Sequence, residues 1–273
     1  MRRLMPLPVF LFAAAVGAAP VSAQTPDFTL VNPPPSACTT QNPAFTTDDL
    51  SGVTSPCAVA PGSVLIETLY YQNASRVGGT ALAAYPLFRL RSGIVRRLEA
   101  VVDLPSQIAE SGLNGAGLYP RTQLGFGLNY TAMANERMAL GFGAEIMPPS
   151  SRFTVNEAQP RYVIDFTVGY HLLPRTTLSA IATGSSSRQV GFNQVSPAAA
   201  VRLAYDSSVA TQLSTDLGTR VVSRHSVAQS YGDVAINERI RRNTTFSVGL
   251  GTTFNPVSNA KAHYLASGLN FHL

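Results

Sequence analysis

The chain has no tryptophan, a single lysine, two cysteines, and charged side chains at only 13% of its 273 positions. Two cysteines are too few for a scaffold held together mainly by disulfides, and 21 glycines are too few for a collagen-like chain. Because 45% of the residues are apolar, the chain is not wholly disordered. Beyond residue 20 no apolar run is long enough to cross a bilayer as a helix, which excludes a helical membrane protein.

The first 23 residues have the layout of a secretory signal peptide. A basic start at residues 1–3 precedes a mostly apolar core at 4–20 and small residues at 21–23. Three prolines and a glycine within 4–20 argue against a buried helix. We therefore predict that residues 1–23 direct export by the general secretory route and are then removed.

Charge gives little sign of a nucleic-acid partner. Removal of Arg2 and Arg3 with the signal peptide lowers the formal net charge from +5 to +3, without a clustered basic face. The basic residues are unusual in kind, since all except Lys261 and the histidines are arginine. Arginine holds bidentate pairs with carboxylates better than lysine does, so this bias favours a protein with internal ion pairs.

Residues 24–62 form an irregular, proline-rich lead that contains both cysteines, Cys38 and Cys57. Export takes these thiols to an oxidising compartment, where we expect a disulfide. Closing a loop of about 20 residues would restrict the unfolded chain by roughly 3 kcal/mol. Two free thiols are the alternative, and no zinc-ligand spacing surrounds them.

From residue 63 to the end, apolar and polar residues alternate with a period of two. Apolar or aromatic side chains occupy every even position from Leu124 to Tyr130, whereas glutamine, glycine and asparagine occupy the odd positions. Residues 137–146, 162–172 and 246–254 repeat the pattern, and helical spacing fits none of them. About twelve strands are predicted, at 63–73, 84–94, 97–104, 122–132, 137–147, 161–173, 176–185, 197–206, 209–222, 230–241, 244–255 and 262–273. Pro86 interrupts the second of these early, and the seventh and tenth patterns are weak.

Short turns and long loops alternate between these strands. The longer loops are predicted at 74–83, 105–121, 148–160, 186–196, 223–229 and 256–261. Outer-membrane barrels have tight turns at the periplasmic rim and longer loops outside, and strands of about 10–12 residues cross a bilayer when tilted. We therefore predict an all-β, antiparallel, up-and-down transmembrane β-barrel of about twelve strands (10–14) over residues 63–273. Five tyrosines near strand ends suit an interfacial girdle: Tyr130, Tyr162, Tyr170, Tyr205 and Tyr264.

A secreted soluble β-sandwich or jelly roll is the alternative fold. Its strands would also alternate, but with the apolar face inside and the polar face in water. The loop lengths of a sandwich need not alternate, and its strands are usually shorter. The barrel is therefore the preferred interpretation.

In a membrane barrel the polar face of each strand points inward. The charged residues expected to line the lumen are Glu67, Arg89, Arg91, Glu99, Asp103, Arg137, Glu145, Asp165, Arg202, Asp216 and Arg220. Between the second and third strands, one register sets Arg91 opposite Glu99 and another sets Arg89 opposite Asp103; either pairing is favourable. Such a two-signed wall would line a narrow channel, or it would fill a lumen too small to conduct. Residues 24–62 would enter this lumen as a plug or remain in the periplasm.

Signals for an enzyme are weak. His225, Ser226 and Asp233 are near one another in sequence, but no G-x-S-x-G motif accompanies them. A histidine beside a serine in a loop is more often solvated surface. We therefore expect no catalytic residues, no metal site and no cofactor, and a barrel hydrolase is only a third hypothesis.

The stretch 87–99 carries a family resemblance. Its residues Arg89, Arg91, Gly93 and Glu99 resemble the "leucine-arginine-x-Gly … Arg-x-Glu" hairpin of the transporter-like "phenol-degradation meta-pathway" family of bacterial outer-membrane proteins. Where that family usually has Gly-Asp before its next strand, this chain has residues 119–121, Tyr-Pro-Arg. The resemblance implies a mid-sized barrel that moves small hydrophobic or aromatic compounds.

These observations predict a channel of the bacterial outer membrane that passes small molecules through an arginine- and acid-lined lumen. Its expected partners are membrane lipid and a small-molecule solute. The alternative is a non-conducting structural or surface-binding barrel, whose loops 105–121 and 148–160 engage an outside partner.

Overall fold

The structure is a computed structural model of the chain, and the residues it describes are Cys38, 53–75, 81–104, 107–112, 115–120, 124–149, 160–189, 192–221, 228–255 and 260–273. Residues 1–33 form one unit and 34–273 another, and the account below concerns the second. The predicted signal peptide at 1–23 lies outside the described residues, as does most of the lead at 24–62. Among the described residues there is no helix long and apolar enough to cross a membrane.

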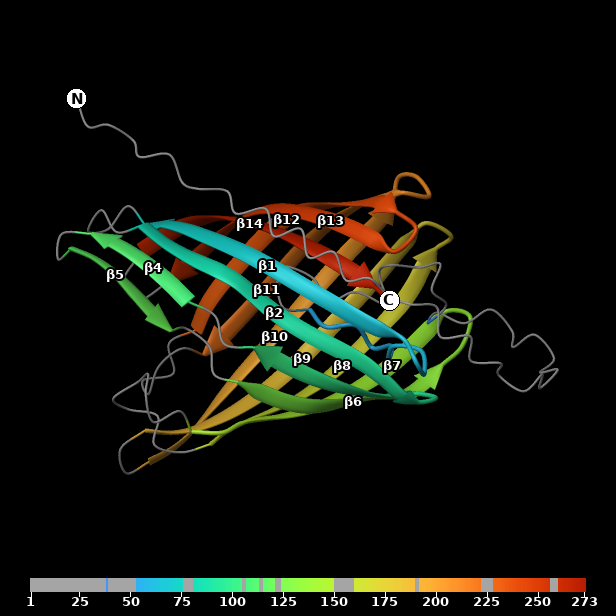
Figure 1. The fold of residues 1–273 in the computed structure, drawn as a ribbon. Helices are drawn as coiled ribbons and strands as arrows, with labels where there is room; N and C mark the ends of the chain where they lie inside the picture. The colour runs from blue at the N-terminus through green and yellow to red at the C-terminus, as the bar shows by residue number, and fades with distance from the viewer. Residues whose placement is uncertain are drawn as a thin grey trace, which may run out of the picture. The chain divides into compact units, whose positions relative to one another are not determined.

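The regular structure of the described chain is entirely β-strand (Figure 1). The strands are β1 (Val64–Ser75), β2 (Ala81–Val95), β3 (Leu98–Leu104), β4 (Gln107–Gly112), β5 (Gly115–Pro120), β6 (Gly125–Ala134), β7 (Met138–Met147), β8 (Arg161–Leu173), β9 (Thr176–Gln189), β10 (Phe192–Asp206), β11 (Thr211–Val221), β12 (Ala228–Arg241), β13 (Thr244–Asn255) and β14 (Ala260–His272).

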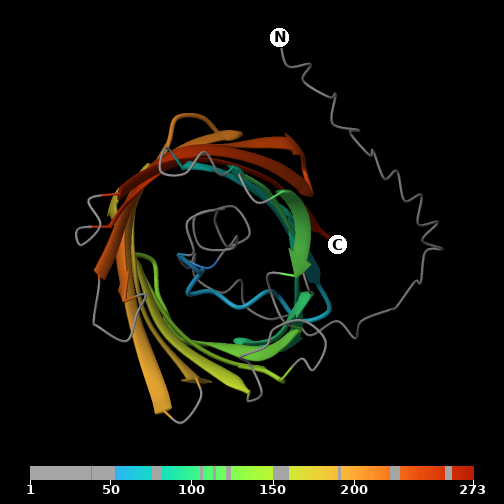
Figure 2. The ribbon, with the colours of Figure 1, turned by 90° about the vertical axis from the view of Figure 1, so that its left-hand side faces the viewer.

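Twelve of these strands close into a single barrel. Each pairs antiparallel with its neighbours in chain order, and β1 joins the ends of the sheet by pairing with both β2 and β14. The remaining two strands, β4 and β5, form a hairpin beyond β3 and β6, and β4 pairs with residues 81–84 of β2. Viewed end-on, the strands form a ring (Figure 2). Each of the twelve barrel strands therefore has a paired strand on both sides, which removes the free edges that an open sheet would have.

The strand predictions agree closely with this barrel, and two loop predictions are wrong. All twelve predicted strands are present, with ends that move by a few residues, including the two weakly patterned ones that became β9 and β12. Pro86 does not break β2, because a bulge opposite residue 70 absorbs it. The loop predicted at 186–196 is mostly strand, because β9 runs to Gln189 and β10 begins at Phe192, its register partner. The stretch 105–121 was predicted as a loop, but β4 and β5 lie within it. These segments are glycine-rich and lack clean alternation, so the period-two pattern did not reveal them.

The outer face of the barrel is apolar and exposed. Large apolar side chains that alternate along the strands are open to the surroundings, as Ile164 at 65%, Leu217 at 68% and Leu250 at 60% illustrate. The intervening positions are buried and largely polar, such as Thr167, Asp216 and Ser247. A soluble sandwich would bury the first set and expose the second, so that alternative is excluded. The outside of this barrel is suited to lipid.

Four of the five tyrosines predicted for an interfacial girdle have the outward exposure that a girdle requires, and the fifth does not. Tyr130, Tyr162, Tyr170 and Tyr205 are exposed on the outer face. Tyr264 is only 8% exposed, and its hydroxyl donates a hydrogen bond to the Asp233 carboxylate inside the barrel. Tyr264 therefore belongs to the interior and not to an outer girdle.

Candidate functional site: the barrel interior

The first interior cluster begins with Arg89 on β2 and Asp103 on β3. The two residues are direct partners in the strand register. Arg89 Nε lies 2.6 Å from Asp103 Oδ1 and Arg89 Nη2 lies 2.8 Å from Oδ2, a bidentate pair. Glu145, from β7, approaches the same guanidinium, with its Oε2 3.7 Å from Nη2.

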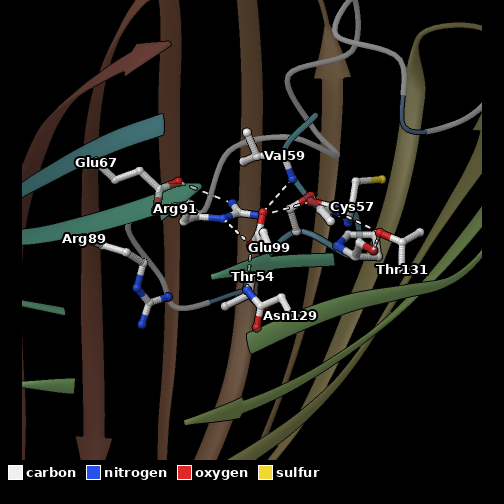
Figure 3. Close-up of polar contacts among 12 residues, drawn as sticks. Thr54, Cys57, Val59, Glu67, Arg89, Arg91, Glu99, Asn129 and Thr131 are labelled. Carbon is white, nitrogen blue, oxygen red and sulfur yellow. Dashed lines mark hydrogen bonds and ion pairs between the residues drawn. The ribbon is translucent and has the colours of Figure 1, made fainter. Parts of the chain in front are cut away.

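Arg91 and Glu99 extend this cluster and are both fully buried. Arg91 Nε donates to Glu99 Oε1 at 2.7 Å, and Nη1 lies 3.6 Å from Glu67 Oε1 on β1. Asn129 Nδ2, from β6, donates to the same Glu99 oxygen at 2.8 Å (Figure 3). The sequence presented the two arginine–acid pairs as alternatives, but both exist. Glu99 is directly opposite Gly93, and the long Arg91 side chain reaches it diagonally.

The second cluster lies across β10, β11 and β12. Arg202 and Asp216 are direct register partners and form a bidentate pair, with Nε–Oδ1 and Nη2–Oδ2 distances of 2.8 Å. Asp233 is the partner of Asp216 on the next strand. Tyr264 donates to Asp233 Oδ2 at 2.5 Å. Each cluster therefore holds a bidentate Arg–Asp pair with a further carboxylate from another strand, Glu145 on β7 in the first and Asp233 on β12 in the second.

Three of the predicted lumen residues join neither cluster. Arg137 lies in the tight turn before β7 and is exposed. Arg220 is exposed near the other end of the barrel, where its Nε donates to Gln229. Asp165 lies partly buried on β8 opposite Gly143, and a Cβ added at Gly143 would collide with its carboxylate.

Residues 53–60 run through the interior as an extended segment, called the inner segment below (Figure 2, in blue). One wall holds its later part. Glu99 Oε2 accepts a hydrogen bond from Val59 N at 2.5 Å, and Arg91 Nη2 donates to Cys57 O at 2.9 Å. Thr131 on β6 accepts from Ala58 N at 2.7 Å and donates to residue 56 O at 3.1 Å. Figure 3 shows these contacts converging on the first cluster.

The opposite wall holds the start of the inner segment. Thr54 Oγ1 lies 3.1 Å from Thr167 Oγ1 on β8, and Arg202 Nη1 donates to Val53 O at 3.5 Å. Val53 is 1% exposed and packs against Ile181. The inner segment therefore spans the barrel from the second cluster to the first, and it carries no charged side chain of its own.

Two glycines on the inner wall provide room for this segment. A Cβ added at Gly93 would collide with the backbone oxygens of Val59 and Ala60. A Cβ added at Gly141 would lie 2.7 Å from the Cα of Pro56. Because these contacts are with backbone and not with flexible side-chain ends, any larger residue would have to move the segment.

The predicted disulfide between Cys38 and Cys57 is present. Cys57 is 1% exposed and packs against Ala139 on β7 and Ala204 on β10. The disulfide therefore ties Cys38 to the middle of the inner segment.

The interior of the described barrel has more acids than bases. The sequence suggested similar numbers of each, but Arg137 and Arg220 lie at the ends of the barrel. The acidic groups of the two clusters and β8 are Glu67, Glu99, Asp103, Glu145, Asp165, Asp216 and Asp233, whereas the basic groups are Arg89, Arg91 and Arg202. Within the described residues, no group of three or more His, Cys, Asp or Glu could hold a metal ion.

Sequence reasoning missed Asp233 and Tyr264 as partners within one site. In the sequence Asp233 is prominent only through its nearness to His225 and Ser226, and these two residues lie outside the described part of the chain. The alternation of β12 would have placed Asp233 on its inner face together with Asn237. The backbone groups of the inner segment have no signal of their own in the sequence.

Comparison with known proteins bears on the fold. No protein-family model and no curated protein matches the chain. Among solved structures, the COG4313 outer membrane channel from Pseudomonas putida F1 matches with a TM-score of 0.59 and 14% identity, over 79% of this chain and 97% of that one. The NanC porin matches with a TM-score of 0.52 and 10% identity, over 75% of this chain and 98% of that one. At these identities the likeness is one of fold. A closed barrel with this fold and an apolar outer face is a protein of the bacterial outer membrane.

Proposed function

We propose that the chain is a narrow outer-membrane channel for ions and small polar solutes, with the inner segment as its constriction. The observation that carries the proposal is the polar interior of a closed barrel whose outer face is apolar. Lumens of this kind conduct when solvent can pass beside the charged groups. The proposal assigns no catalytic role to any residue.

Both clusters support a selective role for the lumen. They place fixed charges on opposite walls at the level where the inner segment crosses, so a solute passing the segment would pass these charges. Charged rings at a constriction select permeant ions by sign. The aromatic or hydrophobic cargo implied by the family resemblance remains a hypothesis. It is tested by whether such a compound blocks the ionic current.

The test is single-channel recording from residues 24–273 refolded in a planar bilayer. Discrete current steps are expected. Replacing Arg89 and Arg91 together by glutamate should shift the reversal potential in a salt gradient, and the exposed Arg220→Glu variant is the matched control. An unchanged reversal potential in a folded double variant would remove these arginines from the selectivity role.

A non-conducting barrel is the second candidate, and the fully buried Arg91–Glu99 pair favours it. Both side chains are 0% exposed, as expected for groups that fill an interior and not for groups that line an open pore. A folded, inserted but silent barrel would support this candidate. Deletion of residues 24–62 then separates a plug from a filled lumen, since only a plugged barrel would begin to conduct.

A further inference from the structure

The tight turns at one end of the barrel are joined into a closed ring. Beyond the strand ladders, the backbone of each turn accepts a hydrogen bond from the strand that follows it around the barrel. The donor–acceptor pairs are Thr131 N to Arg97 O, His171 N to Arg137 O, Asp206 N to Arg175 O, Arg239 N to Ala210 O and His272 N to Asn243 O, all at 2.8–2.9 Å. Reciprocal bonds between Val64 and Leu273 complete the ring. The positions of the turn residues are therefore fixed relative to one another.

Four of these five turns carry exposed arginines. We call this set of six residues the arginine collar: Arg96, Arg97, Arg137, Arg175, Arg241 and Arg242. The acids at the same rim are fewer, and two of them have partners, since Asp206 accepts from Gln212 and Glu238 accepts from Thr211. Glu136 is the exposed acid among the described turn residues. The rim therefore presents an excess of positive charge.

The collar lies at the edge of the apolar outer face. Exposed apolar residues come directly before three of its turns: Ile94 (51%), Val95 (53%), Leu172 (47%), Leu173 (64%) and Ile240 (57%). Side chains of this kind mark the depth at which the lipid-facing surface ends. An arginine one or two residues further along is at the depth of the headgroups, and its long stem lets the guanidinium reach them.

We propose that the arginine collar binds the headgroups of anionic phospholipids in the leaflet at the short-turn rim. The guanidinium group matches a phosphate with paired hydrogen bonds, and basic groups next to a bilayer are attracted to anionic lipid. Because the ring already holds the turns in place, lipid binding orders only side chains and headgroups. The inference concerns lipid at the rim and is independent of whether the lumen conducts.

The test measures lipid preference in the folded barrel. Mature protein is reconstituted in phosphatidylcholine bilayers, and the association constant of spin-labelled phosphatidylglycerol is compared with that of spin-labelled phosphatidylcholine. The parent protein should prefer phosphatidylglycerol by about five-fold or more, and this preference should weaken as salt is raised. Combined Arg96→Gln, Arg97→Gln, Arg241→Gln and Arg242→Gln changes should bring the ratio near one.

Two variants serve as controls. Replacing the same four arginines by lysine keeps the charge and should keep most of the preference. Arg161→Gln removes an exposed arginine from the opposite end of the barrel and should leave the ratio unchanged. An equal preference in parent and glutamine variants would overturn the proposal, as would a parent that shows no preference. If the glutamine variant does not fold, a parental preference that is insensitive to salt would overturn it equally.

Discussion

Charged side chains inside this barrel contact one another through ion pairs and hydrogen bonds. Arg91 is fully buried, and it contacts Glu99, Glu67 and the backbone oxygen of Cys57. Removing a buried partner leaves the remaining charges without compensation, which costs far more than an exposed pair contributes.

Arg91→Met should therefore lower the free energy of unfolding by about 3–5 kcal/mol, because Glu99 would stay buried without its guanidinium. Urea unfolding of the refolded barrel measures this change. Adding Glu99→Gln to Arg91→Met should recover a large part of the loss. The exposed Arg220→Met variant is the matched control, with an expected change within about 0.5 kcal/mol. Equal losses for Arg91→Met and Arg220→Met would contradict the buried-cluster interpretation.

Among the elements, the inner segment depends on the two wall glycines that its backbone contacts, Gly93 and Gly141. Gly141→Ala would put a methyl group against the Pro56 backbone, so the segment has to shift or the wall has to bend. We expect a loss of about 1–3 kcal/mol in unfolding free energy, together with a changed single-channel conductance. Gly184→Ala is the control, because a Cβ there meets nothing within 4 Å. A conductance change in both variants, or in neither, would argue against a constriction where the inner segment contacts Gly141.

Strands were predictable from the sequence because each has one face in lipid, and this imposes a strict period of two. The pattern fails where that constraint is absent. The hairpin of β4 and β5 lies beyond the barrel wall, and the inner segment is extended without alternating. The tight turn between β2 and β3 limits the register to a few choices, so the sequence could name the Arg89–Asp103 pairing as one of two alternatives, and the register of the structure selects it. Asp233 and Tyr264 meet across strands that are not joined by one tight turn, and only the full register brings them together.

For the whole molecule, the interior carboxylates outnumber the interior arginines in the described barrel. A pore that conducts past this wall should favour cations, since like-charged walls concentrate counter-ions. In a potassium chloride gradient the reversal potential should have the sign of cation selectivity. Combined Glu145→Gln and Asp233→Asn changes should move it toward zero, while neutralising the exposed Glu136 should not. A parent protein that prefers anions would contradict this prediction and leave the channel proposal standing.

The inner segment precedes β1 in the chain, whereas β1 closes the ring by pairing with β14 at the extreme C-terminus. Because β14 follows the other barrel strands in the chain, its pairing with β1 can form only after all of them have been synthesised. Early docking of the inner segment is topologically simple, because strands that contact it, among them β2, β3, β6 and β8, can then assemble around it. If the inner segment entered later, the loop closed by the Cys38–Cys57 disulfide would have to pass into a barrel that had already closed. We therefore expect the inner segment to dock on the interior before β1 pairs with β14 and closes the ring.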